Sequence, residues 1–420
     1  MKRIALYLLL AAGADVRAQQ VMRLSEQQAL SIALQQHWDY RQSAIAVRGA
    51  EADAVQAAAA PNPTLTVSTA NINPHSGVGA GPLSSKAVDS IVRVDQLIER
   101  GGKRQLRSDM AQQRVAAAEA DRADSRRALE RDISQAYTDL LASQERMRVL
   151  TEIAALHDQS LAVAQKRHRA GDLAEVEVAR LQLEVQRAHN DLTAAALQRR
   201  TASFTLAQQL GLALPLPQLE ASDAWTDALP GMPAGEGGAC DGRADVQAAR
   251  ARLAAANSGL ALARAGRTRD VSIGVQAEHL PADAAHPQGT GNSFGFSVQN
   301  PLFVRYNNEG EIGAALAAQD AATLALEKAR TQACGEADQS SQQLAASQER
   351  AAAYQAGLLQ ASRHVAETSE FAFEHGALGV TDVLDARRSY RMTQLDGIDA
   401  RADYLKALAA WRATHSFATP

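Results

Sequence analysis

Aromatic side chains are scarce in this 420-residue chain, where Phe, Trp and Tyr together make up 4% of the residues. Hydrophobic residues reach 46%, but alanine supplies much of that share. This is little material for one large globular core. Because alanine is the strongest helix former and lets backbones approach closely, the composition favours long helices packed side by side.

Signatures of catalysis are also lacking. The sequence has no G-x-S-x-G, no H-E-x-x-H and no convincing pair of catalytic carboxylates. No spacing of His, Cys and Asp suits a tight zinc site. The formal net charge is −4, and nothing in the charge pattern suggests nucleic-acid binding. We therefore expect no enzyme, no cofactor and no resident metal.

The first residues are typical of a secretory signal. Lys2 and Arg3 precede a short apolar stretch, and residues 16–18 fit a small-residue cleavage site. The apolar stretch is too short to span a bilayer. We expect residues 1–18 to be a signal peptide, with a short membrane anchor as the alternative.

Helix signals dominate the remaining chain. Ser25 and Gln28 form a capping box, which predicts a helix beginning near Glu26, and a second helix is predicted at about 40–60. Residues 103–210 contain almost no helix breaker except Gly171, and residues 308–416 are similar, with interruptions at Gly376 and Gly379. A helix of about 65 residues would be about 100 Å long.

Four short segments alternate apolar and polar residues with a period of two, which predicts β-strands. They form two expected hairpins, 64–97 and 270–303, each with a long loop rich in Gly, Pro, Ser and His. Cys240 and Cys334 lie in helices that flank the second hairpin. In an exported protein two cysteines allow one disulfide, so a Cys240–Cys334 bond is one outcome and two free thiols the other.

The chain also repeats itself at an offset near 205 residues. "HRAGDLAEVEVARLQ" at 168–182 aligns with "EFAFEHGALGVTDVLDARR" at 370–388 when Gly171 is set on Gly376. Each half reads as helix, hairpin, very long helix, short break and long helix. The expected organisation is a signal peptide at 1–18, a first repeat at 19–212, a linker at 213–240 and a second repeat at 241–420.

The strands have the pattern of transmembrane β-strands, with one apolar and one polar face over about ten residues. Open sheet edges cannot exist in lipid, and four strands cannot close a barrel. Other copies of the chain would have to complete the sheet, and periodicity alone allows a dimer or a trimer. The alternative is a small soluble sheet that caps a coiled coil.

The stretch "LIERGGKRQLR" at 97–107 has the glycines and lysine of a phosphate-binding loop but not its G-x-x-x-x-G-K-[ST] pattern. Gly101 and Gly102 instead fall at a strand-to-helix turn, where glycine permits positive φ. Lys103 and Arg104 follow, and we expect these basic side chains near anionic headgroups at the periplasmic face of a membrane.

These features together resemble the TolC-type outer-membrane efflux factor family over about residues 22–415. The resemblance is carried by "HRAGDLAEVEV", "FEHGALGVTDVLDARRSY", "AAPNPTLTVS" and "RADVQAARARL". "VDQLIERGGKR" at 94–104 is most similar to the heavy-metal branch, the CzcC-like components of cobalt–zinc–cadmium efflux systems.

The resemblance implies a mainly α protein with a small β part. It implies a homotrimer in which twelve strands form a barrel in outer-membrane lipid and long antiparallel helices form a periplasmic α-barrel. Such a protein is a passive conduit in the outer membrane of a Gram-negative bacterium. Its implied partners are a periplasmic adaptor (membrane fusion) protein and an inner-membrane resistance–nodulation–division pump, and the heavy-metal branch implies divalent cations as substrate.

The resemblance also implies two groups of site residues. Two helical hairpin tips would meet the adaptor, and carboxylates would ring the narrow periplasmic entrance, where negative charge favours cations. The tip residues are His168, Arg169, Ala170, Gly171, His375, Gly376, Ala377 and Leu378. The entrance residues are Glu177, Asp382 and Asp385, for which a solvated acidic face is the alternative. Leu378 stands where better-known members often carry an arginine that helps latch the entrance.

Two other functions stay open at this point. One is a multidrug or type I secretion channel of the same architecture. The other is a structural periplasmic coiled-coil protein of the envelope that conducts nothing. An integral barrel would stay with outer membranes after a carbonate wash, whereas a periplasmic coiled coil would be removed.

Overall fold

The computed structural model describes residues 21–70, 72, 81–82, 88–226, 228–231, 240–280, 291–375 and 377–415. The expected signal peptide, most of the two hairpin loops and Gly376 lie outside these residues. The chain divides into two compact units. The tip unit comprises Met1–Gln42, Ser125–Gly238 and Gly335–Ser416, and the sheet unit comprises Ser43–Asp124, Ala239–Cys334 and Phe417–Pro420.

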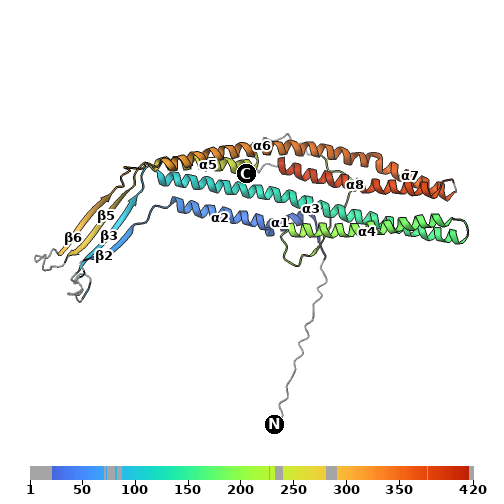
Figure 1. Ribbon diagram of the computed structural model, residues 1–420, viewed down its shortest axis with the longest axis horizontal. Coiled ribbons are helices and arrows are strands. Elements are labelled where there is room, and N and C mark those ends of the chain that lie inside the picture. The colour runs from blue at the N-terminus through green and yellow to red at the C-terminus, as the bar shows by residue number, and fades with distance from the viewer. Residues whose placement is uncertain are drawn as a thin grey trace, which may run out of the picture. The chain divides into compact units, whose positions relative to one another are not determined.

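Helices make up most of the described chain, as the composition predicted (Figure 1). They are α1 (Glu26–Gln36), α2 (Trp38–Ala58), α3 (Lys103–Arg169), α4 (Glu175–Gln209), α5 (Ala244–Ala265), α6 (Glu309–Ala353), α7 (Leu359–Glu374) and α8 (Val380–His415). The capping box is confirmed: Ser25 Oγ accepts from the Gln28 amide at 3.3 Å, and Gln28 Oε1 accepts from the Ser25 amide at 3.0 Å. The 67 residues of α3 span about 100 Å.

A π-helical segment interrupts the second long helical stretch. The sequence predicts unbroken helix from 308 to the break near Gly376, but Tyr354–Leu358 is π-helical and separates α6 from α7. A π-turn adds a residue to the helical repeat, which shifts the faces of the helix on its two sides. Within this segment Gly357 has backbone angles that are not helical. The alanine-rich sequence around it gives no sign of this change.

Four strands form one antiparallel sheet in the sheet unit, in the order β2-β3-β5-β6 (Figure 1). The strands are β2 (Thr64–Ala70), β3 (Asp89–Ile98), β5 (Val271–Leu280) and β6 (Gly291–Gln299). In the register, Val94 lies opposite both Leu65 and Val275, and Val275 lies opposite Phe296. The sheet ends earlier than the expected hairpin boundary at 303, because Pro301 cannot donate to a strand ladder.

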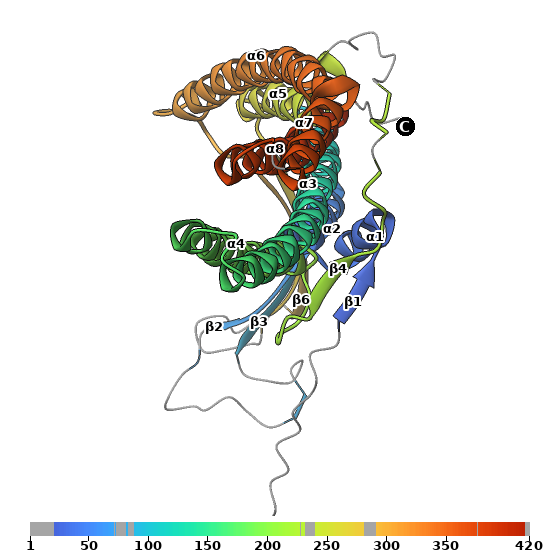
Figure 2. The same ribbon diagram turned by 90° about the vertical axis from the view of Figure 1, so that its right-hand side faces the viewer.

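A second, small sheet lies in the tip unit and was missed from the sequence. β1 (Val21–Leu24) pairs in parallel with β4 (Gln218–Ala221), beside α1 (Figure 2). Four residues are too few for a period of two to stand out. The sheet contributes Leu24 and Leu219 to a core with Ile133, Leu206 and Leu210, each at most 5% exposed. This core joins β1, α1 and the end of α4 to α3.

No helix among the described residues is both long enough and apolar enough to cross a membrane.

Candidate functional site

The sheet has one exposed apolar face. The alternation predicted from the sequence places Leu65 and Val67 on it from β2, and the other three strands add to the same side. Its exposed members are Leu65, Val67, Val92, Val94, Val275, Phe294, Phe296 and Val298, each between 39% and 85% exposed. A face this apolar is unusual on a surface in contact with water and marks a site of contact with lipid or with protein.

The opposite face of the sheet is polar and carries an ion pair. Arg93 Nη2 donates to Asp95 Oδ1 at 2.8 Å and to Ser297 Oγ at 2.9 Å. These contacts join β3 to β6 across β5. The sequence placed Arg93 and Asp95 on the polar face, but it could not show that they pair with each other and with Ser297.

The predicted strand-to-helix turn lies between β3 and α3. Gly101 and Gly102 have φ of +72° and +69°, the left-handed region in which glycine carries no steric penalty. Lys103 Nζ lies 2.9 Å from Asp270 Oδ1, and its side chain is only 14% exposed. Lys103 therefore pairs with Asp270 within the chain, and its expected position near headgroups stays a prediction. Arg104 is exposed.

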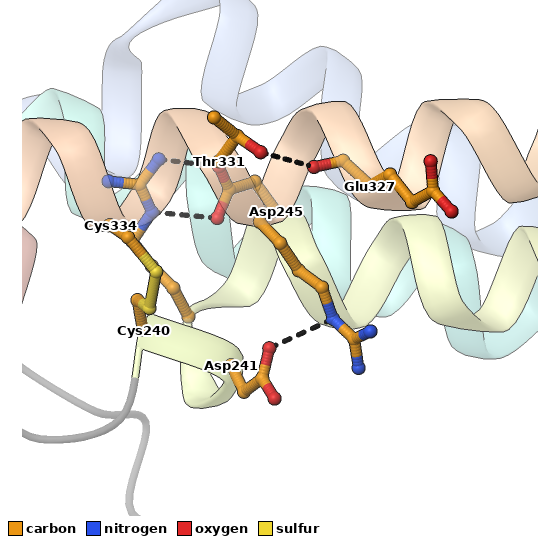
Figure 3. The surroundings of a disulfide bond; sticks show 8 residues. Cys240, Asp241, Asp245, Glu327, Thr331 and Cys334 are labelled. Atoms are coloured by element: carbon orange, nitrogen blue, oxygen red, sulfur yellow. Dashed lines mark hydrogen bonds and ion pairs between the residues drawn. A yellow bond between two sulfur atoms is a disulfide. The ribbon is translucent and has the colours of Figure 1, made fainter.

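Cys240 and Cys334 form a disulfide with their Cα atoms 5.2 Å apart (Figure 3). It ties the short turn before α5 to α6. Next to it, Arg330 on α6 pairs with Asp241 at 2.9 Å, and Val246 packs with Leu326 in a buried cluster. Covalent, ionic and apolar contacts therefore hold α5 against α6.

The two helical hairpin tips both lie in the tip unit. α3 ends at Arg169, and Gly171 turns the chain with φ of +84°. His168 Nδ1 contacts the Leu173 carbonyl at 2.8 Å, across the turn. His375 caps the end of α7, and its ring lies against that of Phe371 with centroids 4.1 Å apart and the two planes tilted by 37°. Ala170, Ala377 and Leu378 are exposed, so both tips present side chains to the surroundings.

An open cavity of about 390 Å³ lies between these two hairpins. Its lining is mainly apolar, with Phe373 and Leu384 among its side chains, and Arg167, Arg387 and Glu370 add charge. Arg387 Nε donates to Glu370 at 2.5 Å and its Nη1 donates to Ser160 at 2.8 Å. Arg387 thus joins α8 to α7 and to α3.

The predicted entrance carboxylates lie near the starts of α4 and α8. Glu177 is half-buried, Asp382 is exposed, and Asp385 is 66% exposed on its side chain and 3.4 Å from Arg388. Within the described residues, no group of three or more His, Cys, Asp and Glu side chains is arranged to hold a metal ion. One copy of the chain therefore does not gather these carboxylates into a binding site.

A buried ionic contact next to these carboxylates was missed. Glu184 on α4 is 5% exposed on its side chain, accepts from Arg187 at 2.9 Å and pairs with Arg388 on α8. Burial is the largest single influence and raises the pKa of Glu184, but the hydrogen bonds and charges of Arg388 and Arg187 together outweigh it and leave the pKa of this carboxyl lowered. Residues 184 and 388 differ by 204, close to the repeat offset, which is the one sequence signal that could have paired them.

His157 lies in the same region. It is 7% exposed on α3, and its Nδ1 has no hydrogen-bond partner among the residues that the structure describes. Burial lowers the pKa of His157, and the charge of Arg387 lowers it further. The imidazole is therefore neutral near pH 7.

A family model described as "Outer membrane efflux protein" matches residues 29–212 and 238–414. The cobalt-zinc-cadmium resistance protein CzcC of Cupriavidus metallidurans is 24% identical over 368 residues, which cover 87% of this chain and 84% of that protein.

Solved structures share the fold over nearly the whole chain. The structure of CusC matches with a TM-score of 0.78 and 18% identity, covering 93% of this chain and 92% of that one. A membrane protein from Pseudomonas aeruginosa matches with a TM-score of 0.78 and 21% identity, covering 93% of both chains. Because the family model spans most of the sequence, the chain belongs to the outer membrane efflux protein family, the non-enzymatic TolC-type channels of the outer membrane.

Proposed function

We propose that three copies of this chain form the outer-membrane conduit of a tripartite efflux system that passes divalent metal cations. The observation that carries the proposal is the four-stranded sheet with one exposed apolar and one polar face. Lipid would cover the apolar face, and the polar face would line a water-filled pore.

The sheet edges support assembly from several copies. β2 and β6 are the outer strands, and within the described residues each pairs on one side only. Unpaired strand edges are not tolerated in lipid, so each edge needs a partner. Three sheets would supply twelve strands, enough for an open pore, whereas eight would leave a filled interior. In this proposal residues 1–18 are the export signal and the two repeats at 19–212 and 241–420 each supply one hairpin.

The hairpin tips are the proposed docking site for a periplasmic adaptor, which would connect the conduit to an inner-membrane resistance–nodulation–division pump. The proposed contact residues are His168, Arg169, Ala170, Gly171, His375, Gly376, Ala377 and Leu378. Ala170, Ala377 and Leu378 are apolar but exposed, which supports this assignment. Their side chains remain available for contact with a partner. Energy for transport would come from the pump.

Glu177, Asp382 and Asp385 are the proposed entrance carboxylates. Asp382 and Asp385 lie one turn apart on α8 and both are exposed, so three copies would bring six carboxylates to one level of the tube. A ring of carboxylates attracts cations, and weak contact with each group lets them leave.

The entrance assignment has a direct test. Asp382→Asn with Asp385→Asn should reduce the cation preference of single channels in a planar bilayer and weaken their block by divalent cations. A matched control neutralises two exposed carboxylates elsewhere, Glu51→Gln with Asp53→Asn on α2. Equal block in both double variants and the unmodified protein would remove the entrance role.

The choice of metal ions rests on two supports. One is the similarity to a protein named for cobalt, zinc and cadmium resistance. The other is the "VDQLIERGGKR" stretch at 94–104. The test is growth of a strain that lacks this protein on zinc, cobalt, cadmium, nickel, copper and silver, with detergents and antibiotics alongside. Sensitivity to some metals alone, reversed by the intact gene, is expected. Sensitivity to organic compounds alone would keep the conduit and exclude metal as its substrate.

A further inference from the structure

The polar face of the sheet holds its charges close to the backbone. Arg93 and Asp95 both lie on β3, two residues apart and on the same side. Arg93 Nε donates to both carboxylate oxygens of Asp95, at 2.9 and 2.8 Å, and Arg93 Nη2 donates to Oδ1 at 2.8 Å. The side chains of Arg93 and Asp95 are only 31% and 24% exposed, which is low for charged groups on the surface of a sheet.

Gly274 is the reason that these side chains can lie flat. It faces Asp95 across the ladder on β5 and lies beside Ser297 on β6. A Cβ at Gly274 would collide with Asp95 and Ser297 and would come within 3.2 Å of Arg93 Nη2. The ion pair therefore occupies the space that a side chain at position 274 would fill.

The pairing also changes the charge of this face. On the polar side, Glu278 stands two residues from Gln276 on β5, and Ser293 Oγ donates to it at 3.4 Å. With Arg93 present, Asp95 is neutralised and Glu278 is the remaining charge of these three. Asp89 lies on the same side of β3, four residues before Arg93. Without Arg93, Asp95 would add one unpaired carboxylate per chain to this wall, and three in a trimer.

We infer that Arg93, laid over Gly274 and bound to Asp95 and Ser297, sets the ion preference of the pore at the level of the membrane. The inference rests on the proposed trimeric barrel and extends it. A wall lined with free carboxylates would retain divalent cations that have already passed the entrance, and conduction requires that ions also leave. Arg93 removes the charge of one carboxylate per chain from the wall, and Gly274 keeps the guanidinium out of the pore.

The experiment is block of single channels by cobalt ions in planar bilayers, with the full-length protein and four variants. Arg93→Gln should make the block about 30-fold stronger, the effect of one unscreened carboxylate about 4 Å from a divalent ion in water. Asp95→Asn should weaken it and lower the cation preference, since Arg93 is then unpaired. The double variant should return to the original block, which a loss of strand contacts alone would not produce.

Gly274→Ala is the geometric control. It keeps every charge but pushes the side chains of Asp95 and Arg93 away from the wall and into the pore. The conductance should therefore fall although the charge of the wall is unchanged. Where Arg93→Gln does not assemble, Asp95→Asn carries the test, because its effect has the opposite sign. Conducting channels with the same cobalt block in Arg93→Gln, Asp95→Asn and the original protein would overturn the inference alone. Absence of conductance from the original trimer would overturn the proposed function and this inference with it.

Discussion

Glu184 shows how a single buried carboxylate can hold two helices together. Its side chain is 5% exposed, whereas its partners Arg187 and Arg388 are 54% and 44% exposed. Water can therefore stabilise the two arginines after the carboxylate is removed, and the loss should be moderate rather than extreme. The free energy of unfolding that is lost with the carboxylate is that of hydrogen bonds to a charged group.

Glu184→Gln is expected to lower the free energy of unfolding by about 1.5 kcal/mol at pH 7. Because the pKa of Glu184 is lowered in the fold, its stabilisation is present above the ordinary value of 4.5 and is lost as the pH falls through the folded pKa. Thermal unfolding followed by circular dichroism should show a difference from the original protein that shrinks on acidification. Glu367→Gln is the control, since Glu367 pairs with Arg363 but is 60% exposed and should cost at most about 0.5 kcal/mol. A Glu184→Gln difference that is the same at all pH values would contradict the account.

His157 gives a second pH dependence, at a higher pH. The groups that face it are Glu184 from α4, Arg387 and Arg391 from α8, and Asp158 beside it on α3. Burial and the two arginines lower its pKa from 6.5, so the unfolded chain binds this proton more readily than the fold does. The original protein should therefore lose stability as the pH falls below about 6.5. His157→Gln should flatten the profile of unfolding temperature between pH 7 and 5, and equal slopes in the two proteins would count against a neutral buried imidazole.

At the scale of the elements, the turn that ends α4 is a place where a small substitution should have a large effect on stability. α4 ends at Gln209, and Gly211 follows with φ of +71°, while the Leu212 amide donates to the Ala207 carbonyl at 3.3 Å. A Cβ at Gly211 would lie 2.6 Å from the Gln36 carbonyl oxygen at the end of α1. Because the atoms in the way belong to the Gln36 backbone, they cannot move aside as the end of a flexible side chain could.

Gly211→Ala and Gly102→Ala form a matched pair. Both glycines have positive φ, but a Cβ at Gly102 would meet nothing within 4 Å. Gly102→Ala should cost only the left-handed penalty of about 1–2 kcal/mol. Gly211→Ala should cost clearly more, with loss of the packing between α1 and α4. Urea unfolding of both variants compares them, and equal losses would mean that the contact with Gln36 relaxes without cost.

The Cys240–Cys334 disulfide also acts on the elements, because it joins the turn before α5 to α6. It closes a loop with a sequence separation of 94 residues, for which chain entropy gives about 4–5 kcal/mol. Cys240→Ser with Cys334→Ser should reduce hydrogen-exchange protection in α5 and in the first part of α6, while α4 keeps its protection. Mass spectrometry of the original protein after alkylation should find no modified cysteine, and two alkylated thiols would contradict the bond.

The elements differ in how much of them the sequence could reveal. The capping box at Ser25 and the four alternating strands are local patterns, and both were predicted. β1 and β4 are too short for a pattern, and the π-segment at Tyr354–Leu358 lies in uniform alanine-rich helix. Contacts such as Glu184 with Arg388 depend on the packing of helices far apart in the sequence, which periodicity does not encode.

At the scale of the whole molecule, the central claim is that three chains close one conducting barrel. In the proposed barrel, further copies would cover the strand edges that β2 and β6 leave unpaired within the described residues, and the pattern of strands alone allowed two or three copies. The most direct measurement is the mass of the detergent-purified protein by native mass spectrometry, with single-channel recording of the same preparation. The account predicts a complex of three chains that conducts ions through a stable open pore. A single chain or a dimer, or a trimer that leaves the bilayer non-conducting, would contradict it.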